Sequence, residues 1–146
     1  MIWTPRTTVA AVIEQNDRFL LVEELIDGKM TLNQPAGHLE SGESLIDAAI
    51  RETQEETAWQ FRPTAIIGIY RWQHPKNGET YMRYCFTGDA VQHYPEQALD
   101  ADIHQAIWLT KQEFLARQDA FRSPLVLDCF NDYLAGHRYP LTLLKN

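Results

Sequence analysis

Apolar positions along the chain fall into short runs of β-branched, aliphatic and aromatic residues, separated by turn-forming residues. These runs predict strands over residues 7–14, 19–22, 31–34, 65–72, 81–86 and 107–109. Turn dipeptides lie between them at 16–17, 27–28 and 77–78. The first two strands are therefore predicted to form one hairpin, and the strands on either side of Asn77-Gly78 to form another.

Three other segments carry helical signals. The longest covers residues 44–57, and a second begins at Thr110, where Glu113 three residues later is typical of a capping box. The third covers 124–135 and stops at Gly136. Strands and helices follow one another without a linker or a repeat, so we expect a single α/β domain over 1–146. It would hold one mixed β-sheet with helices on both faces.

Composition then excludes several classes of protein. The chain has 146 residues, is 45% apolar and carries a formal net charge of −7, which is typical of a globular domain and not of a disordered or membrane-spanning one. An acidic protein is not expected to bind nucleic acid nonspecifically. Cys85 and Cys129 have neither disulfide-scaffold nor metal-site spacing, and the first residues show no secretory signal, so we expect a cytoplasmic protein.

The negative charge is concentrated in one segment. Residues 37–59 contain six acidic residues and a single base, Arg51. On a helix with 100° per residue, Glu52, Glu55 and Glu56 lie within one arc beside an apolar face. One interpretation is a solvated acidic helix face; the other is a site for a hard divalent cation such as Mg²⁺, which prefers carboxylate oxygens.

The loop before this helix favours the second interpretation. From Gly37, five residues lead to Glu43, seven more to Arg51-Glu52, and two more to Glu55-Glu56. This spacing resembles the Nudix box, Gly-x5-Glu-x7-Arg-Glu-U-x-Glu-Glu-x-Gly-U, in which U is a bulky aliphatic residue. Three packing or turn positions depart from it: Thr53, Ala58 and Trp59 replace an aliphatic residue, the glycine and the last apolar residue.

The resemblance implies a Nudix-type α/β/α sandwich and hydrolysis of a phosphoanhydride assisted by Mg²⁺ or Mn²⁺. It also implies site residues. Metal ligands would be the Gly37 carbonyl, Glu55 and Glu56, with Glu52 a ligand or the general base. Arg51 would hold the carboxylates in place, and Glu43 would brace the loop. A further acid often precedes a late Trp-containing strand in this family; Asp102 is the candidate, with Asp100 nearby, although a surface turn also explains Asp102.

Three further segments, residues 33–40, 122–126 and 136–141, resemble bacterial phosphatases within the family. This narrower resemblance implies a monomeric, Mg²⁺-dependent enzyme that releases orthophosphate from nucleoside tri- and diphosphates and from hydroxymethylpyrimidine pyrophosphate, a thiamin precursor. Two alternatives remain open. One is a housecleaning pyrophosphatase for ADP-ribose or dinucleoside polyphosphates; the other is a non-catalytic domain that senses a nucleotide.

Four residues outside the box are candidate substrate contacts. Trp72, at the end of a predicted strand, is suited to stacking on a base ring, although core or strand-end packing is the more common role of such a residue. Arg83 alternates along its strand with apolar neighbours and can reach phosphate or form a surface salt bridge. Asn33 and Gln34, just before the box, either read a base edge or satisfy backbone groups.

Overall fold

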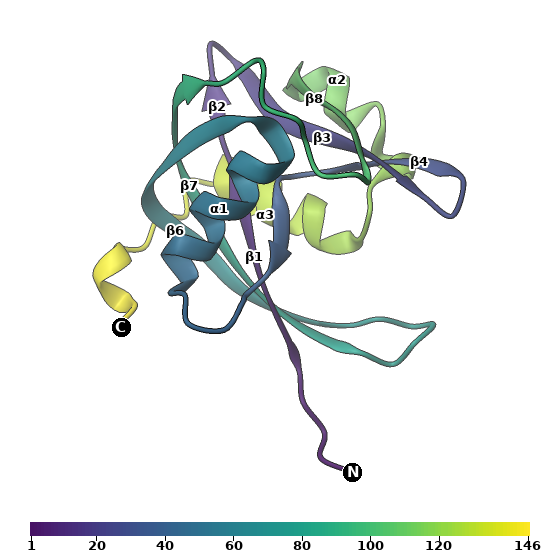
Figure 1. Ribbon diagram of the computed structural model, residues 1–146, viewed down its shortest axis with the longest axis vertical. Helices are drawn as coiled ribbons and strands as arrows, with labels where there is room; N and C mark the ends of the chain where they lie inside the picture. Colours follow the sequence, from purple (N-terminus) through teal and green to yellow (C-terminus); the bar gives the residue numbers. More distant parts are fainter.

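The computed structural model describes residues 1–146 (Figure 1). Its strands are β1 (Arg6–Val12), β2 (Glu14–Gln15), β3 (Arg18–Ile26), β4 (Lys29–Asn33), β5 (Ala36–His38), β6 (Trp59–Gln73), β7 (Thr80–His93) and β8 (Ile103–Thr110). Its helices are α1 (Leu45–Thr57), α2 (Lys111–Leu115) and α3 (Pro124–Leu134), with short 3-10 turns at η1 (Gln118–Ala120) and η2 (Leu141–Leu143). None of the helices combines the length and the apolar character that a membrane span requires.

The strands form two sheets. The first has the order β5-β1-β7-β6 and is mixed, because β1 and β7 run parallel while the other pairs are antiparallel. The second is antiparallel and is centred on β3, which pairs with β2, β4 and β8. The predicted α/β class with a mixed sheet is confirmed, but the prediction of only one sheet is wrong.

The division into two sheets arises at Ile13. The predicted strand 7–14 ends as β1 at Val12, and only Glu14 and Gln15 pair back onto β3 across the Asn16-Asp17 turn. The predicted hairpin is therefore short, since most of β1 pairs with β5 and β7 instead. Local alternation of apolar residues specifies a strand but does not say which neighbour it pairs with.

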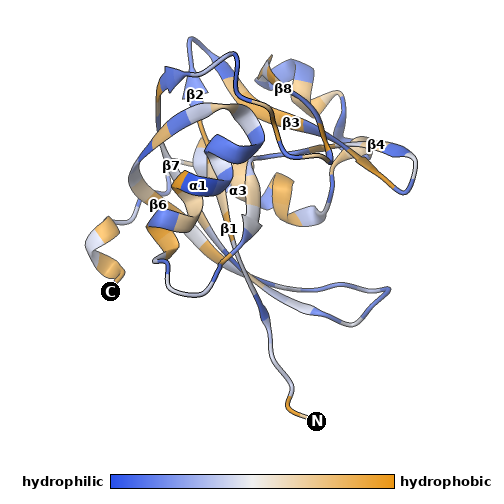
Figure 2. Ribbon diagram, viewed as in Figure 1, coloured by the Kyte–Doolittle hydropathy of each residue, from blue (hydrophilic) through white to orange (hydrophobic).

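Both faces of the first sheet are covered, which confirms the three-layer α/β/α arrangement. Alternate residues of β1 point to opposite sides: Val9 and Ala11 pack with α1, whereas Ala10 and Val12 pack with α3 and the second sheet. Figure 2 shows apolar stretches along β3 and α3 and a strongly hydrophilic stretch on α1.

The helices lie where the sequence predicts them. Ser44 caps α1 by accepting from the Asp47 N–H at 3.0 Å, and Thr110 and Glu113 form the predicted capping box of α2. Strands β6 and β7, in contrast, extend well beyond the predicted residues. The extension of β6 over residues 59–64 alternates Trp59 and Phe61 with polar residues, but Pro63 and two bulges interrupt this pattern, and the pairing with β7 continues across them.

Candidate metal and substrate site

Helix α1 presents its acidic residues at the edge of the first sheet. Its buried side packs Ala48, Ala49 and Thr53 on the sheet, so the neighbouring arc with Glu52 and Glu55 lies beside the edge strand β5. The helix ends at Ala58, which adopts φ 61° and donates its N–H to the Gln54 carbonyl at 2.9 Å. The family glycine at this position is thus replaced by an alanine in the left-handed conformation that glycine favours.

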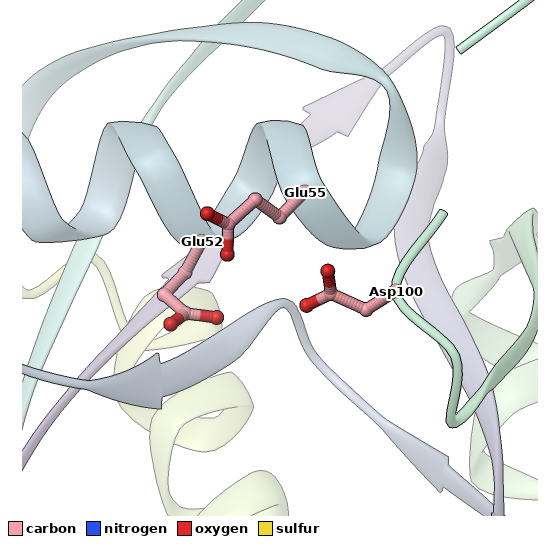
Figure 3. A group of neighbouring side chains, drawn as sticks. All are labelled: Glu52, Glu55 and Asp100. Atoms are coloured by element: carbon pink, nitrogen blue, oxygen red, sulfur yellow. The ribbon is translucent and has the colours of Figure 1, made fainter. Parts of the chain in front are cut away.

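Three carboxylates from two segments converge next to β5. One ligand oxygen each from Glu52, Glu55 and Asp100 lies within 4.8 Å of the others (Figure 3). Asp100 belongs to the loop before β8, and its N–H donates to the Glu55 carbonyl at 3.0 Å. This bond docks the loop on α1. Asp102 is the late acid that the sequence favours, but the structure places Asp100 in the cluster and Asp102 on the wall of the adjoining cavity.

Glu56 lies deeper than the other three acids. Its side chain is buried, and one carboxyl oxygen accepts the Ala36 N–H at 2.9 Å. Burial raises the pKa of Glu56 to about 9, with a smaller contribution from the nearby negative charge of Glu24. Burial also raises the pKa of Glu52. Without a metal, burial disfavours the ionised form of these two carboxyl groups. A bound cation would instead favour the ionised form, and so would lower both pKa values.

Arg51 is the only base within this acidic segment, and it binds four of its groups at once. Its guanidinium donates to both carboxyl oxygens of Glu43 at 2.9 and 2.7 Å, to Glu52 at 2.7 Å and to Glu55 at 3.1 Å. It also donates to the His38 carbonyl at 3.0 Å, which ties the loop to the helix. The hydrogen bonds from Arg51 lower the pKa of Glu43. One cation nevertheless leaves excess negative charge among these carboxylates.

Gly37 gives Glu52 the space that it occupies. A Cβ atom built on Gly37 would overlap the Glu52 carboxylate, so any side chain at 37 would displace it. The Glu52 carboxylate therefore keeps its position beside the loop only with glycine at residue 37. Three converging carboxylates, with the buried Glu56 on the same helix, suit a hard divalent cation.

A cavity of about 500 Å³ adjoins the acidic cluster and extends beneath the end of the β6–β7 hairpin. Its walls include seven of the residues predicted for the site: Asn33, Gly37, Glu52, Glu56, Trp72, Arg83 and Asp102. Arg51, Glu55 and Gln34 are not in its walls. Gln34 is fully buried, and its amide oxygen accepts from the Arg83 guanidinium at 3.1 Å.

The structure adds cavity residues that the sequence analysis missed. Tyr81 and His74 flank Trp72, with ring centroids 5.9 and 5.1 Å from it, and all three line the cavity. Glu24 lines it from β3 and accepts from the Asn33 amide at 2.9 Å. Tyr81 lies on the same face of its strand as Arg83, and this alternation could have identified it from the sequence. No such pattern points to Glu24 as a cavity residue.

Comparisons with known proteins give a consistent result. The NUDIX domain family model matches residues 4–129. The chain is 39% identical to phosphatase NudJ of Escherichia coli K12 over 143 residues, which cover 98% of this chain and 92% of the relative. A solved NUDIX hydrolase from Nitrosomonas europaea has a TM-score of 0.96 and 50% identity, covering 98% of this chain and 97% of its own. The NUDIX domain of Shewanella oneidensis NrtR, solved with ADP ribose, shares the fold alone at a TM-score of 0.75 and 17% identity, over 92% and 90% of the two chains.

Proposed function

Since this chain belongs to the Nudix hydrolase family, we propose that it hydrolyses phosphoanhydrides of nucleoside tri- and diphosphates and of hydroxymethylpyrimidine pyrophosphate, releasing orthophosphate. The observation that carries the proposal is the convergence of Glu52, Glu55 and Asp100 beside a cavity that also contains Arg83 and Trp72. The acidic cluster suits a metal ion that binds phosphate groups. The cavity beside it, with a cation and an aromatic ring in its walls, suits the rest of a nucleotide or of a pyrimidine pyrophosphate. The relative named phosphatase NudJ, 39% identical, supports orthophosphate release in particular.

The metal in this proposal is Mg²⁺, with Mn²⁺ as a substitute. Glu52, Glu55, Glu56 and the Gly37 carbonyl would hold it, with Asp100 or Asp102 completing the set. When bound there, such an ion would supply charge to neutralise phosphate oxygens and would lower the pKa of a bound water. The residues of the chain supply the rest: Arg51 fixes the carboxylates, and Glu52 either takes the proton of the attacking water or serves only as a ligand.

The substrate would lie along the cavity. Trp72, with Tyr81 beside it, is placed to stack on a pyrimidine or purine ring. The Asn33 side-chain oxygen is buried without a hydrogen-bond partner, so it is available to accept from the edge of such a ring. We expect a monomeric cytoplasmic enzyme that acts on these small molecules without nucleic acid or membrane partners.

Product analysis tests the proposal. The purified protein is incubated with Mg²⁺ and GTP, GDP, hydroxymethylpyrimidine pyrophosphate, ADP-ribose or a dinucleoside polyphosphate, and the products are resolved. Orthophosphate from the first three substrates supports the proposed activity. Pyrophosphate or AMP as the main product would instead indicate a housecleaning pyrophosphatase. Tight nucleotide binding without turnover would indicate a sensing domain.

A further inference from the structure

Arg83 is a buried cation without an anionic partner. Its side chain is 8% exposed and forms no salt bridge, although it lines the same cavity as Glu52 and Glu56. The guanidinium donates only to the neutral amide of Gln34, and its Nε atom has no acceptor. Burying an unpaired charge is costly, so an anion that enters the cavity would relieve that cost.

Thr8 is the immediate neighbour of Arg83 on the sheet. The two residues are paired across β1 and β7, so their side chains lie on the same face. The Thr8 hydroxyl is also buried without a partner, and Thr8 also lines the cavity. Two adjacent unsatisfied donors, one of them cationic, match the oxygens of a phosphoryl group.

The position of this pair relative to the rest of the cavity identifies which phosphoryl group it would hold. On the side of the acidic cluster, Thr8 pairs with His38 of β5, the strand that contacts Glu52 and Glu56. On the side of the hairpin, Tyr81 lies two residues before Arg83 and pairs with Trp72. Thr8 and Arg83 thus lie between the acidic cluster and the aromatic rings.

We propose that Thr8 and Arg83 form an anion subsite for the phosphoryl group that stays on the organic product, next to its ring. This inference rests on the proposed function, in which the acidic cluster holds the phosphoryl group that is released. The substrate would need at least two consecutive phosphates, because one phosphoryl group would lie at the acidic cluster and another at the Thr8–Arg83 subsite. It would also bind the organic monophosphate product more tightly than the corresponding unphosphorylated compound.

Equilibrium binding without turnover tests the subsite. Calorimetry in EDTA compares guanosine 5′-monophosphate with guanosine, so that neither metal nor hydrolysis contributes. A charge-assisted pair predicts that the wild-type protein prefers the monophosphate by about tenfold or more. Arg83→Met should abolish this preference, and Thr8→Val, which keeps the shape and removes only the hydroxyl, should reduce it by about fivefold. Arg62→Met is the control, because Arg62 is exposed and pairs with Asp89.

The outcomes separate this inference from the proposed function. An unchanged monophosphate preference in both Arg83→Met and Thr8→Val would overturn the subsite, whatever the hydrolytic activity. If Arg83→Met does not fold, Thr8→Val alone decides, since it changes only a hydroxyl group. A protein that prefers the monophosphate but hydrolyses no substrate would retain the subsite and overturn the proposed hydrolysis.

Discussion

The buried carboxyl group of Glu56 is the clearest test at the scale of a single residue. Glu56→Gln keeps the oxygen that accepts the Ala36 N–H but removes the negative charge. We expect kcat with Mg²⁺ to fall by about 100-fold or more, because a neutral amide is a poor ligand for a hard cation. The free energy of unfolding at neutral pH should stay the same or rise, since the wild-type carboxyl group must take up a proton to be buried at this pH and the amide need not. Steady-state kinetics and urea denaturation measure both; wild-type turnover would disprove a role for Glu56 at the metal.

Arg51 tests the geometry of the site separately from its charge. Arg51→Lys retains one positive charge but cannot donate to Glu43, Glu52, Glu55 and the His38 carbonyl at the same time. We expect a loss of about 10- to 100-fold in kcat/KM or in Mg²⁺ affinity, as is usual when the residues that orient ligands are changed. Arg62→Lys, on the surface, provides the matched control. Equal activity of the two variants would show that Arg51 acts through charge alone.

At the scale of the element, the end of α1 carries a strained residue. Ala58 adopts φ 61°, a conformation that costs about 1 kcal/mol in an L-residue with a Cβ. Ala58→Gly should therefore raise the free energy of unfolding by about 0.5–1 kcal/mol in chemical denaturation. Gly136, which follows α3 at φ 88°, offers the reverse experiment: Gly136→Ala should destabilise by a similar amount. A stabilising Gly136→Ala would contradict this account of helix ends.

At the scale of the whole molecule, the acidic site couples stability to pH. The pKa of Glu56 is about 9 in the metal-free protein against 4.5 when unfolded, so the folded state holds an extra proton between these values. Stability that is fully present below about pH 4.5 is then lost as pH rises toward 9, by up to about 1.4 kcal/mol per pH unit. Thermal unfolding in EDTA over this range measures the slope, and Glu56→Gln should flatten it. A steady rise in stability with pH would contradict the prediction.

Addition of Mg²⁺ should oppose this loss. A cation that binds only the folded protein stabilises it by about 2.7 kcal/mol at 100 times its Kd. The gain should be larger at pH 8 than at pH 6, because protons compete with the metal for the carboxylates. Thermal unfolding with and without Mg²⁺ measures it, and Glu52→Gln with Glu55→Gln should remove most of it. A gain that survives in this double variant would place the cation elsewhere.

Some elements of the fold follow from local sequence, and others do not. Helix α1 was predictable to within a residue, because its cap, its apolar face and its charge pattern are all local features. The outer half of β6, residues 59–64, was not predicted, because Pro63 interrupts its short apolar alternation and only the pairing with β7 carries the strand across it. The assignment of β1 and β3 to different sheets was equally out of reach of local patterns.

The sequence by itself determined the chemistry at α1, because Gly37, Arg51 and the glutamates occupy fixed offsets along one loop and helix. The tertiary structure decided what joins them. Asp100, not Asp102, reaches Glu52 and Glu55, since the loop before β8 docks on the end of α1. Thr8 and Arg83 share one cavity wall only because β1 and β7 pair in parallel, across 75 residues of chain. Offsets along a helix are set by local geometry, whereas contacts between distant strands depend on the whole chain packing into a single core.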